Sequence, residues 1–222
     1  MEVILVGVSV SLGDRHSPIP KGGYGHLFIG QDGETPTMCH HTLLHGNFHV
    51  FLLRIDEDLA AKTQADGCRR CGEVLHKNRY QRKPRGGGLI NLGKGPHFCL
   101  SLTCKMCGKR HNPPSVRFLG SRVYVAATVV LASALRFGLT DARMARLSEW
   151  LRVPERTIAR WRHWWLKDFV ESLFWKNARA RFMPPVVHAA LPASLLEQFK
   201  DPDFPSQLVA LLHFLTGLSE EG

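Results

Sequence analysis

The chain has 222 residues, enough for one ordinary core or two small domains, and carries a formal net charge of +10. Its longest apolar run covers residues 123–135, whereas a membrane span needs ~20 residues, and no basic segment precedes the apolar stretch after Glu2. These features argue against a membrane or secreted protein. We expect a cytoplasmic protein whose six cysteines bind metal or stay reduced.

The positive charge is concentrated in the middle of the chain. Residues 68–182 hold 24 lysines and arginines against six acidic residues, whereas both flanks are acidic. A basic block of this density attracts polyanions and speeds their encounter with the protein. Nucleic acid is therefore the expected partner, and a solvated basic surface is the alternative.

Residues 1–47 show no sustained helical period, and the first 37 are rich in glycine and proline. We expect them to be disordered or weakly strand-forming. Because Met38 lies just before the first helical pattern, part of this stretch is a candidate upstream extension of the reading frame.

Residues 48–67 are predicted to form a leading helix, because their apolar residues recur at spacings of three and four. His41, His45 and His49 would share one face if this helix began early. Three histidines on a face can bind metal, but no cysteine or carboxylate completes a pattern. An ordinary polar face is the preferred interpretation.

The region 68–121 contains two C-x2-C pairs, Cys68 with Cys71 and Cys104 with Cys107, each followed by glycine. Tetrahedral Zn²⁺ takes four thiolate or imidazole ligands, and such pairs supply two from each side of a small antiparallel sheet. The spacing predicts a zinc ribbon with one structural Zn²⁺ and no position open for catalysis. Unliganded thiols or a redox pair are the alternative.

The other two cysteines, Cys39 and Cys99, lack partners at this spacing. Cys99 is predicted to be a buried thiol. Residues 113–118 contain two consecutive prolines and are predicted to be an extended linker between the ribbon and a helical domain.

A basic insert, residues 79–95, lengthens the spacer between the cysteine pairs beyond the usual size. We expect an extended hairpin whose cations contact phosphates or enter a DNA groove. These cations are Arg79, Arg82, Lys83 and Arg85. A solvated loop is the alternative.

Residues 122–182 are predicted to be a helix-turn-helix domain, and residues 183–222 to add two shorter helices, near 193–199 and 206–216. The three helices of the domain are expected at residues 123–137, 141–151 and 154–182. Pro154 suits the first turn of the third helix, because its missing N–H costs nothing there. The stripe of this helix is expected in the core and consists of Ile158, Trp161, Trp165, Phe169 and Leu173.

The window 147–161 places apolar residues where two crossing helices must touch. The second of them would read DNA with the exposed side chains of its first turns, namely Glu155, Arg156, Thr157 and Arg160. Arginine can bond bidentately to guanine, and threonine can contact a thymine methyl group or a phosphate. An ordinary helical hairpin is the alternative.

Two residues depart from the usual helix-turn-helix pattern. Arg152 stands where the turn usually holds glycine, and Ser148 stands where the helix crossing usually holds alanine. If Arg152 adopts a positive φ, the strain is on the order of 1–2 kcal/mol, which a packed domain tolerates.

The order of these motifs resembles the zinc-ribbon and helix-turn-helix DNA-recognition regions of bacterial insertion-sequence transposases. The motifs are C-x2-C, a basic hairpin, C-x2-C-G-K-R, the segment 113–120 and a tryptophan-rich helix-turn-helix. Short uncharacterised bacterial proteins that carry only this part are also similar. Over residues 50–182, the resemblance implies binding to transposon ends or another duplex DNA site through Arg156, Thr157 and Arg160. A transposase or a second copy of the chain is a further candidate partner.

A complete transposase also needs three spaced carboxylates that hold two divalent ions. After Phe182 only 40 residues remain, and Asp201 and Asp203 flank a proline. We therefore expect a DNA-binding protein that is not an enzyme, either an accessory or truncated product of a mobile element or a transcription regulator. An RNA- or protein-binding ribbon is the main alternative. A metal-dependent hydrolase is disfavoured, because no acid/base constellation is visible.

The expected fold class is α+β. It consists of a small antiparallel zinc ribbon followed by a mainly helical helix-turn-helix domain.

Overall fold

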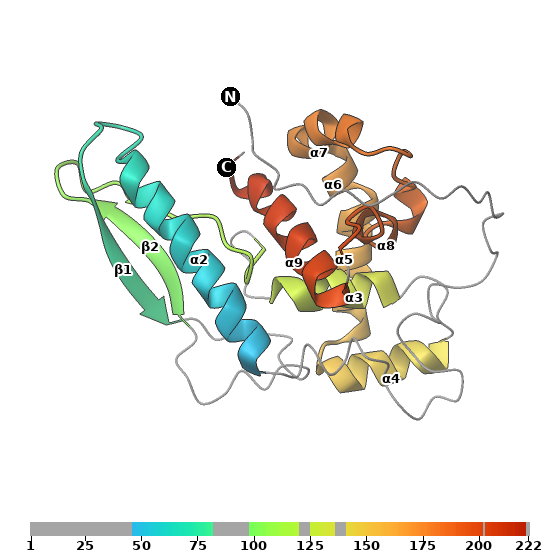
Figure 1. The fold of residues 1–222 in the computed structure, drawn as a ribbon. Coiled ribbons are helices and arrows are strands. Elements are labelled where there is room, and N and C mark those ends of the chain that lie inside the picture. The colour runs from blue at the N-terminus through green and yellow to red at the C-terminus, as the bar shows by residue number, and fades with distance from the viewer. Residues whose placement is uncertain (1–45, 82–97, 120–124, 136–140, 202, 221–222) are drawn as a thin grey trace.

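The computed structural model describes residues 46–81, 98–119, 125–135, 141–201 and 203–220. These residues form an α+β structure, in which a three-stranded antiparallel sheet carrying a four-cysteine cluster is followed by a mainly helical region (Figure 1). The residues 1–45 lie outside the described part, and so do His41, His45 and Cys39.

The sheet has the order β1-β2-β3 and consists of β1 (Leu75–Gln81), β2 (Phe98–Cys104) and β3 (Arg110–His111). β1 contains residues 79–81 of the predicted basic hairpin, residues 79–95, and pairs with β2 from Leu75 with Cys104 to Gln81 with Phe98. The rest of the predicted hairpin, including Arg82, Lys83 and Arg85, lies outside the described residues. The side chains of Leu75 and Leu102 are fully buried beside the cysteines.

The leading helix α2 (Gly46–Asp66) lies along the sheet and also reaches the helical region (Figure 1). Phe48 and Leu52, near its beginning, belong to the hydrophobic core of the helical region. Gln64, near its end, donates a hydrogen bond from Nε2 to the backbone oxygen of Leu75. One helix therefore holds both parts of the molecule together.

Residues 113–118, predicted to be an extended linker between the ribbon and the helical domain, are packed against α2. The carboxylate of Asp56, which is 3% exposed, accepts three hydrogen bonds of 2.7 Å. The donors are the Ser115 hydroxyl, the Val116 backbone N–H and the Arg117 guanidinium. Arg117 also donates to the backbone oxygen of Phe98. A buried carboxylate needs such partners, and they fix the segment to the helix.

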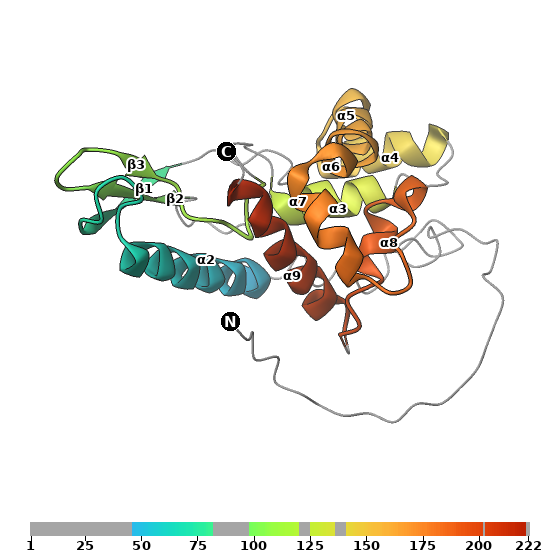
Figure 2. The same cartoon turned by 90° about the horizontal axis from the view of Figure 1, so that it is seen from above.

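The helical region contains seven α-helices and three short 3₁₀ segments within the described residues. The α-helices are α3 (Ala126–Leu135), α4 (Asp141–Leu151), α5 (Glu155–Leu166), α6 (Asp168–Glu171), α7 (Leu173–Ala178), α8 (Ala193–Leu196) and α9 (Phe204–Leu215). The 3₁₀ segments are η3 (Arg179–Arg181), η4 (His188–Ala190) and η5 (Thr216–Glu220). Helix α3 lies in the middle, with α4 to α6 on one side and α8 and α9 on the other (Figure 2).

The predicted third helix, residues 154–182, is broken into shorter helices. Pro154 caps α5 rather than lying in its first turn, and the backbone leaves the helical conformation at Lys167 and again at Ser172. The Ser172 hydroxyl accepts a hydrogen bond from the Trp175 backbone N–H and caps α7. The breaks turn the chain, so that Leu173 is 68% exposed, and the prediction that it lies in the core is wrong.

The breaks serve an aromatic core. Trp165, Phe169 and Trp175 are fully buried, with ring centroids 4.8 Å and 5.0 Å apart in succession. Ile158 and Trp161 are buried as predicted. A straight helix could not bring Trp175 back onto this cluster, so packing overrides the helical periodicity.

In the part of the chain that the structure describes, none of the helices has the length and apolar character of a membrane span.

Candidate metal centre and helix-turn-helix

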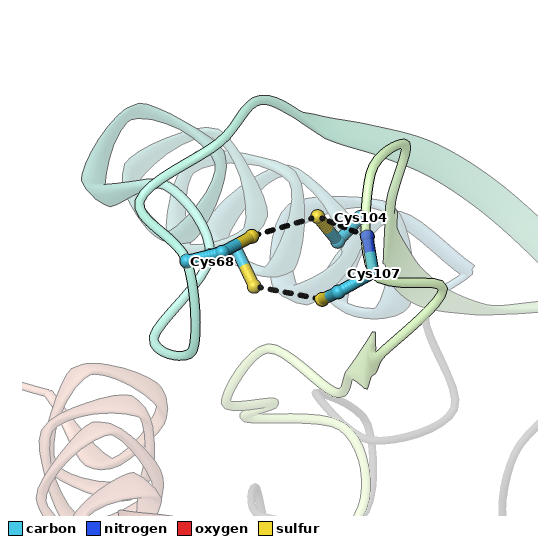
Figure 3. A group of neighbouring side chains, drawn as sticks. Cys68, Cys104 and Cys107 are labelled. Carbon is cyan, nitrogen blue, oxygen red and sulfur yellow. Dashed lines mark hydrogen bonds between the residues drawn. The ribbon is translucent and has the colours of Figure 1, made fainter.

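The four cysteines predicted to bind metal lie together at one end of the sheet (Figure 3). All their Sγ atoms lie within 4.8 Å of one another. The Sγ atoms of Cys71 and Cys104 are 3.4 Å apart, and those of Cys68 and Cys107 are 3.6 Å apart. A tetrahedral Zn²⁺ with bonds of ~2.3 Å would place sulfur atoms about 3.8 Å apart. The group could therefore hold one metal ion.

Each cysteine pair lies in a tight turn that ends at a glycine. Gly72 and Gly108 have φ angles of +74° and +67°, a left-handed conformation that costs glycine little. Their N–H groups donate hydrogen bonds to the backbone oxygens of Cys68 and Cys104. The glycine after each pair, visible in the sequence, is thus what closes both turns.

Hydrogen bonds favour the thiolate form of two of the cysteines. Burial raises the pKa of Cys68, but bonds from backbone N–H groups, including that of Arg70, and from His111 and Cys107 lower this pKa to about 5 overall. The backbone N–H of Cys107 likewise lowers the pKa of Cys104. Metal ligands must be deprotonated, so both turns favour a bound cation.

Cys71 differs from Cys68 and Cys104, which are 3% and 1% exposed, because its side chain is exposed. A hydrogen bond from the Glu73 backbone lowers the pKa of Cys71. The hydrogen bond with Cys104 and the partial desolvation of the sulfur by its neighbours raise this pKa to about 12 overall. Two negative sulfur atoms in contact repel, so in the absence of a cation the cluster keeps part of its protons.

His111 is a neighbour of the cluster that the sequence reasoning missed. Its Nε2 lies 3.3 Å from Sγ of Cys68. The residue lies on β3, and pairing with β2 brings it beside the first cysteine turn. The run C-G-K-R-H that begins at Cys107 was the available signal, since a histidine close behind a cysteine pair is a common companion of zinc.

Cys99 is buried, as predicted, and lies outside this group. It is on β2, five residues before Cys104, so the two side chains leave opposite faces of the strand. The alternation of the strand thus separates the fifth described cysteine from the group of four.

The second predicted site, α4 with the turn and α5, has the packing expected of a helix-turn-helix. Leu147, Leu151, Val153, Ile158 and Trp161 are all buried, with at most 4% of each exposed. Their burial on both helices and in the turn agrees with the apolar pattern of the window 147–161.

Both departures from the usual pattern have a structural explanation. Arg152 has a φ of +51°, the conformation that the turn normally gives to glycine. The Ser148 hydroxyl donates a 2.8 Å hydrogen bond to the backbone oxygen of Val153, and the Val153 N–H donates one of 3.0 Å to the Ser148 oxygen. Ser148 thus ties the turn to α4, a bond that alanine could not make.

Three of the four predicted reading residues are exposed on α5, namely Glu155, Arg156 and Arg160. The prediction for Thr157 is wrong, because its side chain is 3% exposed. Thr157 lies four residues from both Val153 and Trp161, so it shares their buried stripe. Its hydroxyl accepts a 3.2 Å hydrogen bond from Nη2 of Arg160.

No model of a known protein family matches the chain, and neither a curated protein nor a solved structure matches it. The resemblance to transposase recognition regions therefore stays a prediction. The function of the two sites has to be inferred from their own geometry.

The described part of the predicted DNA-binding hairpin is engaged within the protein. The Arg79 guanidinium lies 3.3 Å from a carboxylate oxygen of Glu57 on α2 and 4.6 Å from the ring centroid of Phe98.

Asp203, one of the two acidic residues that flank Pro202, caps α9, because its carboxylate accepts a hydrogen bond from the Ser206 N–H. Arg79 and Asp203 thus both have structural contacts.

Proposed function

We propose that the protein binds duplex DNA in a sequence-specific manner, without catalysing a reaction, and that α5 reads the bases. The observation that carries this proposal is the α4–turn–α5 unit, which buries one face of α5 and leaves cations on the other. A helix held in this way can lie in the major groove with its first turns against base edges.

The exposed cations of α5 form one row. Arg156 and Arg160 are four residues apart, the exposed His163 follows three residues later, Lys167 lies at the C-cap, and Arg152 precedes them in the turn. Residues at these spacings share a helix face. Among the described residues, no acidic side chain forms an ion pair with these cations. They are therefore available for phosphates and bases.

Arg162, on another side of α5, is engaged within the protein. Its guanidinium donates to the backbone oxygens of Ala189 and Leu191 and fastens α5 to the segment before α8. In the row itself, Arg156 and Arg160 suit guanine, and Glu155 suits the amino group of cytosine. The DNA-binding surface would thus be the side of α5 that faces away from Arg162.

The cysteine group supports a structural role for metal in this function. Four thiolates at tetrahedral spacing fit one Zn²⁺ and leave no ligand position for substrate or water. When bound, Zn²⁺ would supply folding free energy to the sheet. We propose that the sheet is a zinc ribbon. We also propose that the protein acts as an accessory protein of a mobile element or as a transcription regulator.

The test is selection of bound sequences from random duplex DNA, followed by affinity measurements on the selected duplex. Replacing Arg156 or Arg160 by alanine should cost ~1–3 kcal/mol and relax base preference at one position, because alanine cannot make a bidentate bond to a base. Arg181→Ala, an exposed cation on η3, is the matched control and should change neither quantity.

Unchanged affinity and preference in both folded variants would exclude α5 as the reader. The main alternative would then be an RNA- or protein-binding ribbon. A preference for single-stranded RNA in the same assay would favour that alternative directly.

A further inference from the structure

A cavity of ≈890 Å³ lies beside the cysteine group, and neither the metal centre nor α5 accounts for it. Its walls come from both cysteine turns, from α2 and from the packed segment after β3. Cations contributed by the two turns line it, namely Arg69, Arg70, Lys109 and Arg110. A cavity of this size could hold a segment of an extended ligand.

The charge of this cavity is uncompensated among the described residues. All four cations are exposed, and none of them forms an ion pair there. The one acidic residue of the lining is Asp56, which is 3% exposed and bound to Arg117. The surroundings therefore favour an anion, and the exposure of the cations suits a ligand that extends beyond the cavity.

The backbone that carries these cations is held by the cysteine turns. The Arg70 N–H donates to Sγ of Cys68, the Lys109 oxygen accepts from the Cys104 N–H at 2.9 Å, and Arg110 pairs with Thr103 across the sheet. Four cations on a rigid frame lose less conformational entropy on binding than the same cations on a loose loop. Metal at the cysteines would stabilise this frame.

We propose that this cavity, defined by Arg69, Arg70, Lys109 and Arg110, binds the phosphodiester backbone of the DNA that α5 reads. This inference rests on the proposed function and adds to it a second contact surface that carries no sequence information. Two of the cations come from the first cysteine turn and two from the residues that follow the second, and such an arrangement matches successive phosphates along a strand better than a single compact anion.

The experiment compares two variants with the same change of charge. The first replaces Arg69, Arg70, Lys109 and Arg110 by alanine. The control replaces four exposed cations outside the cavity lining, namely Arg54, Arg179, Arg181 and Lys200. Affinity for the selected duplex and for a scrambled duplex is measured as a function of salt, in protein with its metal content confirmed.

We expect the cavity variant to lose affinity by the same factor on both duplexes and to keep its base preference. The slope of log affinity against log salt should fall by ~0.9 for each phosphate that the variant no longer binds, whereas the control variant should keep the wild-type slope. If the fourfold variant loses metal, the double variants Arg69→Ala/Arg70→Ala and Lys109→Ala/Arg110→Ala replace it. Each should show part of the loss of affinity and part of the fall in salt slope.

Slopes that are equal in the cavity and control variants would overturn the inference while leaving the α5 proposal intact. The opposite result is a salt slope that falls only in the cavity variant, in a protein that shows no base preference. It would overturn the proposal that α5 reads bases and would leave the cavity as a binding site for the DNA backbone. ATP is the probe for a small phosphate ligand. If the cavity variant loses ATP binding but keeps its slope on duplex DNA, the cavity binds nucleotides and not the DNA backbone.

Discussion

The sheet and the helical region are stabilised in different ways. The buried cluster of the sheet consists of Leu75, Leu102, Cys68 and Cys104, so half of it belongs to the cysteine group that could hold a metal ion. The helical region instead buries large apolar side chains, among them Trp165 and Trp175 with no exposed area. Each fully buried large apolar side chain contributes ~1.5–3 kcal/mol, and the sheet has few of them. The comparison leads us to expect that the sheet is stabilised mainly by metal at its cysteines and the helical region by apolar packing.

The largest expected effect comes from removing the metal. Cys104→Ser should abolish stoichiometric zinc and unfold the sheet, because structural Zn²⁺ contributes ~10–16 kcal/mol in small metal domains. Helix α2 should stay protected near Phe48 and Leu52, which pack in the other core. Metal analysis and amide hydrogen exchange measure both effects.

Cys99→Ser is the matched control, since this cysteine is also buried on β2 but lies outside the group. It should retain zinc. If Cys104→Ser kept zinc and the protection of the sheet, the metal-dependent side of the comparison would be lost.

A smaller effect is expected at the joint between the two regions. Asp56→Ala leaves the Arg117 guanidinium buried without its partner and removes the acceptor of the Val116 N–H. Breaking a buried ion pair from one side costs ~3–5 kcal/mol. We expect the free energy of unfolding in urea to fall by this amount, and the single transition to separate into two as the regions lose their link.

Asp58→Ala, an exposed acid on the same helix, should leave the urea transition almost unchanged. If both variants unfolded alike, the Asp56 cluster would not couple the two regions.

The sequence was most informative where a pattern is local. The cysteine spacing predicted the group of four, residues 141–151 were predicted and found as a helix, and Arg152 has the positive φ that its place in the turn required. Each of these follows from contacts among residues close in the chain or from a ligand set with fixed chemistry.

Two features that the sequence did not reveal depend on contacts distant along the chain. The partners of Asp56 lie about 60 residues away, and His111 reaches Cys68 only through strand pairing. The break at Ser172 is favoured by aromatic packing that helical periodicity does not contain. The burial of Thr157 could have been predicted from the sequence, because its spacing from Val153 and Trp161 places it on the apolar stripe.

The smallest expected effect tests the turn that joins α4 to α5. Arg152→Gly removes the strain of a positive φ, on the order of 1–2 kcal/mol, but glycine also makes the unfolded chain more flexible, which costs ~0.5–1 kcal/mol. We expect a net gain between about 0 and 1.5 kcal/mol in the free energy of unfolding, measured by urea denaturation. The same variant should weaken DNA binding equally on all sequences if this cation contacts phosphate. Arg152→Lys keeps both the strain and the charge, so it should leave stability and binding close to wild type. A glycine variant less stable than the lysine variant would mean that the strain at Arg152 is smaller than the cost of the added flexibility, and would contradict a strained turn of ~1–2 kcal/mol.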